Sequence, residues 1–330
     1  MEKPLQYHRR TYLDGIKKTA TLLSLFAVLF GCLLATPVWA QRNTQPKLLD
    51  RDLFLGDPEI SGAQISPDGN FIAFIKPFKA TRNIWVKRTN EPFSAAKPIT
   101  ADTARPISNY SWSIDGKYIL YGQDKGGDEN FNIYAVNPSD APQNGQEVPP
   151  SRNLTDLKGV RAAIYAVPES DPDLIYVGLN DRDPAWHDLY KVKISTGERT
   201  LLRENKERIT GWVFDLKDQL RLATRSADNG DTELLRVDAQ GFTKVYSSNV
   251  FESCAPVRFH KDGKRVYLVT NKGNDVDLVR LVLFDVDTVK EEFVEADPIN
   301  RVDLASPSFS NVTDELIATV YIDERTRIYW

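Results

Sequence analysis

Short hydrophobic runs with alternating polar positions recur along the chain in a constant order. In each copy a polar turn, often Asp-Gly, precedes a β-rich run, a loop and a second β-rich run. The first copy has Asp68-Gly69 in its turn, a run over residues 71–75 and a second run over residues 83–87. The runs of the later copies span residues 118–121 and 131–136, 174–177 and 188–192, 220–223 and 233–237, 266–269 and 279–284, and 316–320 and 327–330.

The spacing of these turns indicates the architecture. The turn residues Asp68, Asp115, Asp173, Asp218 and Asp262 are separated by 47, 58, 45 and 44 positions. Repeats of about 40–50 residues with about four strands each are typical of β-propeller blades, which bury their faces against neighbouring blades. We therefore predict an all-β β-propeller of four-stranded blades, about five complete and one partial, over residues 61–330. An ordinary β-sandwich with accidental spacing is the alternative.

Helical periodicity is absent from the rest of the chain. No stretch after residue 41 keeps apolar residues at helical spacing, so we do not expect an α/β enzyme core here. Residues 41–60 are predicted to form a segment that leads into the propeller.

The N-terminus has a different composition. Arg9, Arg10 and two lysines precede an apolar run over residues 21–35, and Val38-Trp39-Ala40 follows it. This order is typical of a secretory signal peptide, and the run is short for a membrane span, which needs about 20 apolar residues. We predict a signal peptide over residues 1–40 and export to the periplasm or the extracellular space. An uncleaved signal that anchors the chain in the membrane, or lipidation at Cys32, are alternatives.

Removal of this segment changes the charge and the cysteine count. The chain has a formal net charge of −4 and its first 40 residues carry +3, which leaves −7 for residues 41–330. Such an acidic body argues against nucleic acid as a partner, because phosphate binding needs a basic surface. Only Cys254 would remain, so no internal disulfide is expected.

One segment carries a family resemblance. Gly127-Asp128-Glu129-Asn130 is followed by an aromatic residue and the Ile133-Tyr134 strand, and residues 180–184 and 211–215 add support. From about residue 50 onward, the chain resembles the propeller of the prolyl oligopeptidase family, in its dipeptidyl-peptidase and acylaminoacyl-peptidase branch. The resemblance implies a seven- or eight-bladed propeller and then an α/β-hydrolase domain, whose Ser-Asp-His triad has its serine in a Gly-x-Ser-x-Gly motif.

The chain departs from that pattern in its chemistry. It contains no Gly-x-Ser, and beyond residue 40 its only histidines are His187 and His260, which we place in blade loops. The sequence ends within the sixth predicted blade, at Trp330. We therefore expect a fragment or truncated product with an incomplete ring, without the hydrolase domain and without catalytic residues.

The loops between the second and third strands of the blades are predicted to share one face. They cover residues 124–130, 181–187, 226–231 and 271–277, and they are acidic and polar. We predict a face toward substrate that includes Asp128, Glu129, Asn130, Asp181 and Asp183. In one interpretation these residues form an acidic mouth for peptides with a free amino terminus. In the other, Asp, Asn and Gly only build turns.

The remaining candidates favour structural roles. His187 follows a tryptophan, His260 occupies a turn, and neither has a second ligand at zinc spacing. Residues 228–231 have only a slight likeness to a calcium loop, without its later glutamate. Cys254 is interpreted as a small buried hydrophobic residue. We expect no metal and no cofactor.

These observations lead to one functional expectation and two alternatives. The chain is expected to be the non-catalytic propeller portion of an exported serine peptidase, where it would gate access of peptide substrate to the hydrolase domain of the full-length parent. The first alternative is a stand-alone TolB-like binding module in the periplasm. The second, a propeller hydrolase with a metal in its channel, needs more histidines than the chain offers.

Overall fold

The computed structural model describes residues 48–56, 58–143 and 145–330, and the chain divides into two compact units, residues 1–58 and 59–330. The first unit contains α2 (Asp52–Leu55), a single helical turn. The predicted signal peptide over residues 1–40 and Cys32 lie outside the described residues. Among the described residues, no helix is both long and apolar enough to cross a membrane.

The second unit consists of antiparallel strands, with one short 3-10 turn, η2 (Phe93–Ala95). The strands of the first three sheets are β1 (Ser61–Ile65), β2 (Phe71–Phe78), β3 (Thr81–Arg88) and β4 (Lys97–Pro98); β5 (Tyr110–Trp112), β6 (Ile119–Gln123), β7 (Asn132–Val136) and β8 (Ser151–Asn153); and β9 (Ala162–Ala166), β10 (Leu174–Asp183), β11 (Trp186–Lys193) and β12 (Arg199–Arg203). The strands of the other sheets are β13 (Ile209–Phe214), β14 (Leu220–Ser226), β15 (Thr232–Val237) and β16 (Phe242–Ser248); β17 (Cys254–Phe259), β18 (Arg265–Thr270), β19 (Arg280–Asp285) and β20 (Lys290–Glu295); and β21 (Leu304–Phe309), β22 (Leu316–Asp323) and β23 (Arg325–Tyr329).

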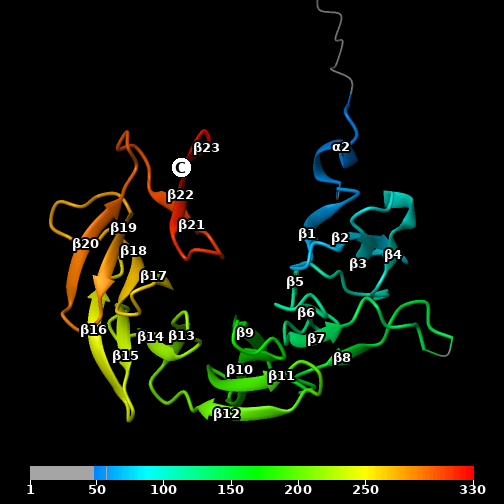
Figure 1. Cartoon of the computed structure of the whole chain (residues 1–330), viewed down its shortest axis with the longest axis horizontal. Helices are drawn as coiled ribbons and strands as arrows, with labels where there is room; N and C mark the ends of the chain where they lie inside the picture. The colour runs from blue at the N-terminus through cyan, green and yellow to red at the C-terminus, as the bar shows by residue number, and fades with distance from the viewer. Residues whose placement is uncertain (1–47, 57, 144) are drawn as a thin grey trace, which may run out of the picture. The chain divides into compact units, whose positions relative to one another are not determined.

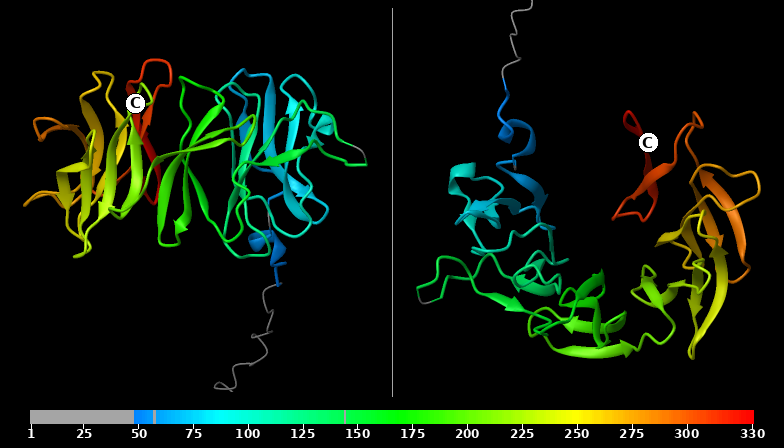
Figure 2. Two further views of the ribbon diagram at one scale, coloured as in Figure 1. Left: turned by 90° about the horizontal axis from the view of Figure 1, so that it is seen from below. Right: turned by 180° about the vertical axis from the view of Figure 1, so that it is seen from behind.

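The sheets form a β-propeller. Each sheet pairs its strands in chain order, five sheets have four strands, and the sixth has three. Within the unit 59–330 the sheets follow one another side by side in the order of the sequence (Figures 1 and 2). The predicted all-β propeller with five complete blades and one partial blade is confirmed for the described residues.

Five hydrophobic clusters hold the sheets together, and each lies between two consecutive sheets. Because side chains alternate along a strand, one strand supplies two clusters. In β10, Ile175 and Val177 pack toward the second sheet, whereas Tyr176 packs toward the fourth. In the same way, Leu281 of β19 belongs to one cluster and Val282 to another. The alternating positions of the sequence therefore fill the space between the blades, as predicted.

The recurring turn between the first and second strands has a defined hydrogen-bond pattern. Ser66 Oγ donates to the Asp68 carboxylate over 2.5 Å and accepts the Phe71 N–H over 2.9 Å. Gly69 has a φ of 72°, a left-handed conformation that glycine adopts without strain. In the fifth sheet His260 takes the serine's place, and its Nδ1 accepts the Asp262 N–H over 3.2 Å. The predicted turn role of His260 is thus visible in its hydrogen bond.

Candidate functional site

One end of each sheet gathers two kinds of connection. In an antiparallel sheet with strands in chain order, the turn from the second to the third strand lies at the same end as the exit from the fourth strand. In the second sheet, the β6–β7 loop and the β8–β9 connection therefore share an end. The predicted Asp128, Glu129 and Asn130 lie in the first of these two segments.

The β6–β7 loop is anchored by an ion pair whose carboxylate is buried and whose guanidinium is partly exposed. Arg105 donates from Nε and Nη2 to the two oxygens of Asp124, over 2.9 and 3.1 Å. Asp124 also accepts the N–H of Glu129, which has a φ of 58°. The side-chain hydrogen bonds of Arg105 hold the pKa of Asp124 below its usual value. The loop is thus fixed at its base by a carboxylate that stays ionised at neutral pH.

Asp128 organises the tip of the same loop. Its carboxylate accepts the N–H of Asn130 over 3.1 Å, the side-chain amide of Asn130 over 3.3 Å, and the N–H of Lys125 over 3.3 Å. The hydrogen bonds from Asn130 lower the pKa of Asp128. Asp128 therefore acts as a turn-building residue here, because its acceptor capacity is used within its own loop.

A pocket of about 500 Å³ lies between this loop and the β8–β9 connection. Its walls contain charged and amide side chains and one apolar residue: Lys125, Asp128, Asn130, Asn132, Asn153, Asp156, Leu157, Lys158 and Gly159. Two of the predicted residues, Asp128 and Asn130, line this pocket, whereas Glu129, Asp181 and Asp183 do not. We take this pocket as the candidate binding site.

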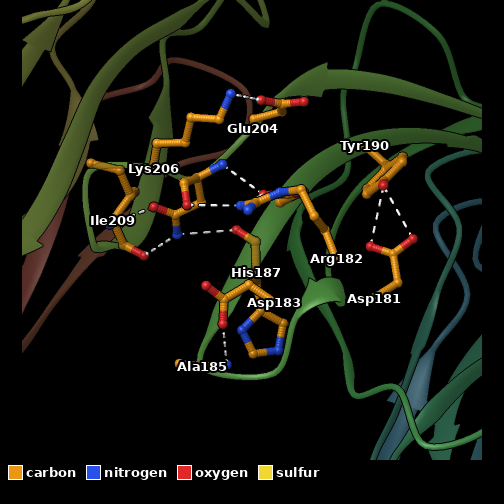
Figure 3. Close-up of polar contacts among 11 residues, drawn as sticks. Asp181, Arg182, Asp183, Ala185, His187, Tyr190, Glu204, Lys206 and Ile209 are labelled. Atoms are coloured by element: carbon orange, nitrogen blue, oxygen red, sulfur yellow. Dashed lines mark hydrogen bonds and ion pairs between the residues drawn. The ribbon is translucent and has the colours of Figure 1, made fainter.

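The other two predicted residues lie in a strand. The expectation that residues 181–187 form a loop is wrong, since β10 extends to Asp183 and β11 begins at Trp186. The β10–β11 hairpin extends beyond the strand ends that were predicted, because Asp183 pairs with Trp186 across it. Tyr190 donates its hydroxyl to both oxygens of Asp181 over 3.2 Å, and the Ala185 N–H donates to Asp183 over 2.9 Å (Figure 3).

A recurrent polar position holds the connections at this end of the sheets. It directly precedes the first buried aliphatic residue of each third strand, and it is occupied by Asn83, Asn132, Asp188, Glu233 and Arg280 in the first five sheets. Asn132 accepts hydrogen bonds from the Thr155 hydroxyl over 2.8 Å and from the Leu157 N–H over 3.1 Å. This position therefore ties the wall of the pocket to the third strand.

In the next two sheets the same position carries a charge. Arg182 holds Asp188 in the third sheet, and Arg225 and Lys244 hold Glu233 in the fourth. Arg280 in the fifth sheet departs from this pattern, because its buried Nε finds no acceptor among the described residues. In the first three sheets this position is an Asn or Asp directly before an Ile or Leu, a recurrence in the sequence that could have identified it.

Neither histidine shows catalytic geometry. His187 lies in strand β11, not in the predicted loop, and its buried Nε2 has no partner among the described residues. Burial, helped by Arg161, lowers the pKa of His187, so the imidazole is neutral at neutral pH. His260 Nδ1 lies 2.9 Å from the carboxylate of Asp262 within its turn.

The remaining candidates make contacts of other kinds. Cys254 is only partly buried, not fully buried as predicted; it packs against the cluster between the fourth and fifth sheets, and desolvation raises the pKa of its thiol to about 12. Asp228 pairs with Arg208, and Asp231 accepts a hydrogen bond from Asn229 over 2.9 Å. Within residues 48–56, 58–143 and 145–330, no three His, Cys, Asp or Glu side chains converge as a metal site.

Comparisons with known proteins identify peptidase relatives. No family model matches the chain. Dipeptidyl aminopeptidase BIII of Pseudoxanthomonas mexicana is 32% identical over 328 aligned residues, which cover 89% of this chain and 46% of that protein. Dipeptidyl peptidase family member 6 of Caenorhabditis elegans is 24% identical over 257 residues, covering 74% of this chain and 34% of the relative. The chain thus spans less than half the length of these curated relatives.

Solved structures with a similar chain path include peptidases and TolB proteins. Acylaminoacyl peptidase of Pyrococcus horikoshii is 16% identical with a TM-score of 0.49, covering 83% of this chain and 45% of that one. The puromycin-hydrolyzing peptidase of Mycobacterium tuberculosis is 17% identical with a TM-score of 0.47, covering 79% and 43%. TolB from Acinetobacter baumannii is 15% identical with a TM-score of 0.42, covering 72% and 54%.

Proposed function

From the premise that the chain is a relative of the dipeptidyl peptidases in its propeller portion, we propose that it is the non-catalytic part of a serine peptidase of the prolyl oligopeptidase family. The observation that carries the proposal is the 32% identity to dipeptidyl aminopeptidase BIII over 89% of this chain. The six consecutive sheets of residues 59–330 agree with a propeller role, because they hold no helix-flanked parallel sheet among the described residues.

The propeller would act on substrate by limiting access. Five buried clusters join the six described sheets, so in a parent protein whose further blades close the ring, a folded protein could not pass between blades without breaking a cluster. Short peptides would then reach a hydrolase domain and folded proteins would not. The chemistry itself would belong to that hydrolase domain, with a serine nucleophile, and to no residue of this chain.

The proposal is tested first on the gene and then on its product. Reading the DNA after the codon for Trp330 should reveal an in-frame continuation with a Gly-x-Ser-x-Gly motif. A stop codon there, confirmed in the transcript, would instead favour the stand-alone TolB-like binding module. The product of the continued gene should release dipeptides from a short chromogenic peptide, leave a folded protein substrate intact, and react with a fluorophosphonate probe.

Export is part of the same proposal. A periplasmic or extracellular peptidase needs a leader, and the basic and apolar order of residues 1–40 supports one. Cell fractionation with N-terminal sequencing should find the mature protein outside the cytoplasm, beginning at Gln41. A cytoplasmic product that begins at Met1 would contradict export, and a membrane-bound product that begins at Met1 would favour the anchor.

A further inference from the structure

The pocket between the β6–β7 loop and the β8–β9 connection has unused positive charge. Lys125 stands on one wall and Lys158 on the other. Neither ammonium group makes an ion pair or a side-chain hydrogen bond with the described residues. Six other lysines of the described residues make ion pairs; Lys193, for example, lies 2.6 Å from Glu198. The pocket therefore offers two ammonium groups, each with three N–H donors, to a ligand.

The negative groups of the pocket are engaged differently. Asp128 has both oxygens occupied by donors of its own loop. Asp156 accepts one long hydrogen bond, 3.4 Å, from the side chain of Asn153. Asn132 and Asn153 also use their side-chain oxygens on neighbouring backbone or hydroxyl groups. The charged groups of the pocket that lack a close partner are therefore mainly ammonium groups, although the formal charges of its four charged side chains sum to zero.

The two lysines and two aspartates of the pocket together favour a ligand with a single negative charge. A phosphate dianion would gain from the two lysines but would be repelled by Asp128 and Asp156 at the same site. A single carboxylate meets the two ammonium groups with less repulsion, and ammonium–carboxylate hydrogen bonds are among the stronger ones in proteins. The volume, about 500 Å³, falls in the range of about 300–1,000 Å³ found for small-molecule sites.

We propose that this pocket binds the free carboxyl terminus of a short peptide, with the carboxylate between Lys125 and Lys158. The carboxylate is inferred from the pocket alone, whereas the choice of a peptide rests on the proposed function. In this role the pocket would retain a substrate or a released product on the propeller. The acidic-mouth interpretation of the same loop expects the opposite end of the peptide.

The test compares two blocked peptides that differ only in the carboxylate. N-acetyl-trialanine and its C-terminal amide are titrated into the full chain by calorimetry at low ionic strength, because salt screens exposed charges. The free acid should bind at least about tenfold more tightly than the amide, and more tightly than inorganic phosphate. Equal binding of acid and amide, or tighter binding of phosphate, would overturn the proposal.

Three variants assign the binding to the lysines. Lys125→Gln and Lys158→Gln should each weaken binding of the acid about tenfold, without changing binding of the amide. Lys217→Gln is the matched control, because Lys217 is exposed, lies in the β13–β14 turn at the opposite end of its sheet, and lines no part of the pocket. A double Lys125→Gln and Lys158→Gln variant that binds the acid normally would contradict the assignment.

These measurements are independent of hydrolysis. Binding of blocked peptides is observed on the chain itself, so a negative result removes the pocket assignment and leaves the proposed peptidase relationship untouched. Conversely, a stop codon after Trp330 would remove the peptidase proposal, and calorimetry would still decide whether the pocket binds a carboxylate.

Discussion

Arg182 holds the carboxylate of Asp188 through two parallel hydrogen bonds, from Nε to Oδ2 and from Nη2 to Oδ1, each 2.7 Å long. The Asp188 side chain is 1% exposed, whereas Arg182 is 37% exposed. Asn205 adds its N–H to Asp188 over 2.6 Å, and Arg182 donates to the Asn205 carbonyl. This group of three residues joins β10, β11 and the connection after β12.

Loss of the carboxylate should destabilise the third sheet. Asp188→Ala removes the acceptor of a buried N–H of Asn205 and leaves Arg182 without its carboxylate partner, although Arg182 keeps its hydrogen bond to the Asn205 carbonyl and can reach water. We expect a loss of about 2–3 kcal/mol in the free energy of unfolding, below the cost of breaking a fully buried pair. Urea unfolding measures it. Glu198→Ala breaks the exposed pair with Lys193 and should have a much smaller effect; equal effects would contradict this reading.

Acid should unfold the protein through such carboxylates. Burial opposes ionisation of Asp188, but the hydrogen bonds from Arg182 and Asn205 outweigh it and lower its pKa. Hydrogen bonds from Arg327 lower the pKa of Asp297 in the sixth sheet. A carboxyl group with a lowered pKa stabilises the fold above its unfolded pKa of about 4, and this contribution is lost as the pH falls through the folded value.

We therefore expect a free energy of unfolding that is nearly constant from about pH 7 to 5 and decreases steadily below about pH 4. Urea midpoints measured at several pH values test this. Asp188→Ala should show a shallower decrease, because one of the responsible groups is gone. A midpoint that stays constant down to about pH 3 would show that these ion pairs do not stabilise the fold.

Truncating a side chain packed between two sheets should lower the free energy of unfolding more than truncating one on an outer strand. Leu189 is fully buried in the cluster between the third and fourth sheets, whereas Leu201 on the adjacent β12 is 45% exposed. Leu189→Ala should lower the free energy of unfolding by about 2–5 kcal/mol, because it removes buried contacts and leaves a cavity. Leu201→Ala, the same change one strand away, should cost less than about 1 kcal/mol. Similar losses would argue against the cluster as the main contact between these sheets.

The thiol of Cys254 should be unreactive in the folded chain. Burial raises its pKa to about 12, so little thiolate exists at neutral pH, and only the thiolate attacks disulfide reagents. In a Cys32→Ser background, labelling by a disulfide reagent at pH 8 should be at least about a hundredfold slower than after unfolding in urea. Rapid labelling of the native protein would contradict the raised pKa of this thiol.

The sequence predicted the second and third strands of each sheet because their faces pack against neighbours and their turns contain Asp-Gly or a related pair. Outer strands were harder to recognise. β8 (Ser151–Asn153) is short and polar, and β20 (Lys290–Glu295) is mostly exposed, so neither has the alternation of a buried strand.

The candidate pocket was predicted in part. Asp128 and Asn130 were found through the Gly-Asp-Glu-Asn segment, which marks the β6–β7 loop. Lys158 and Asn153 were missed, because they come from the β8–β9 connection and meet the loop only when the second sheet is paired. The position of Asp181 and Asp183 in β10 was also missed, since polar residues with a proline beside them are usually read as a loop.

Every sheet in the described residues takes its strands from one uninterrupted stretch of chain. A blade can therefore pair its strands as soon as its own stretch has left the ribosome, although it buries its faces only when a neighbouring blade packs against it. Each new blade then docks on its predecessor through a single buried cluster. Folding can follow the direction of synthesis, with local contacts formed early and few long-range closures required.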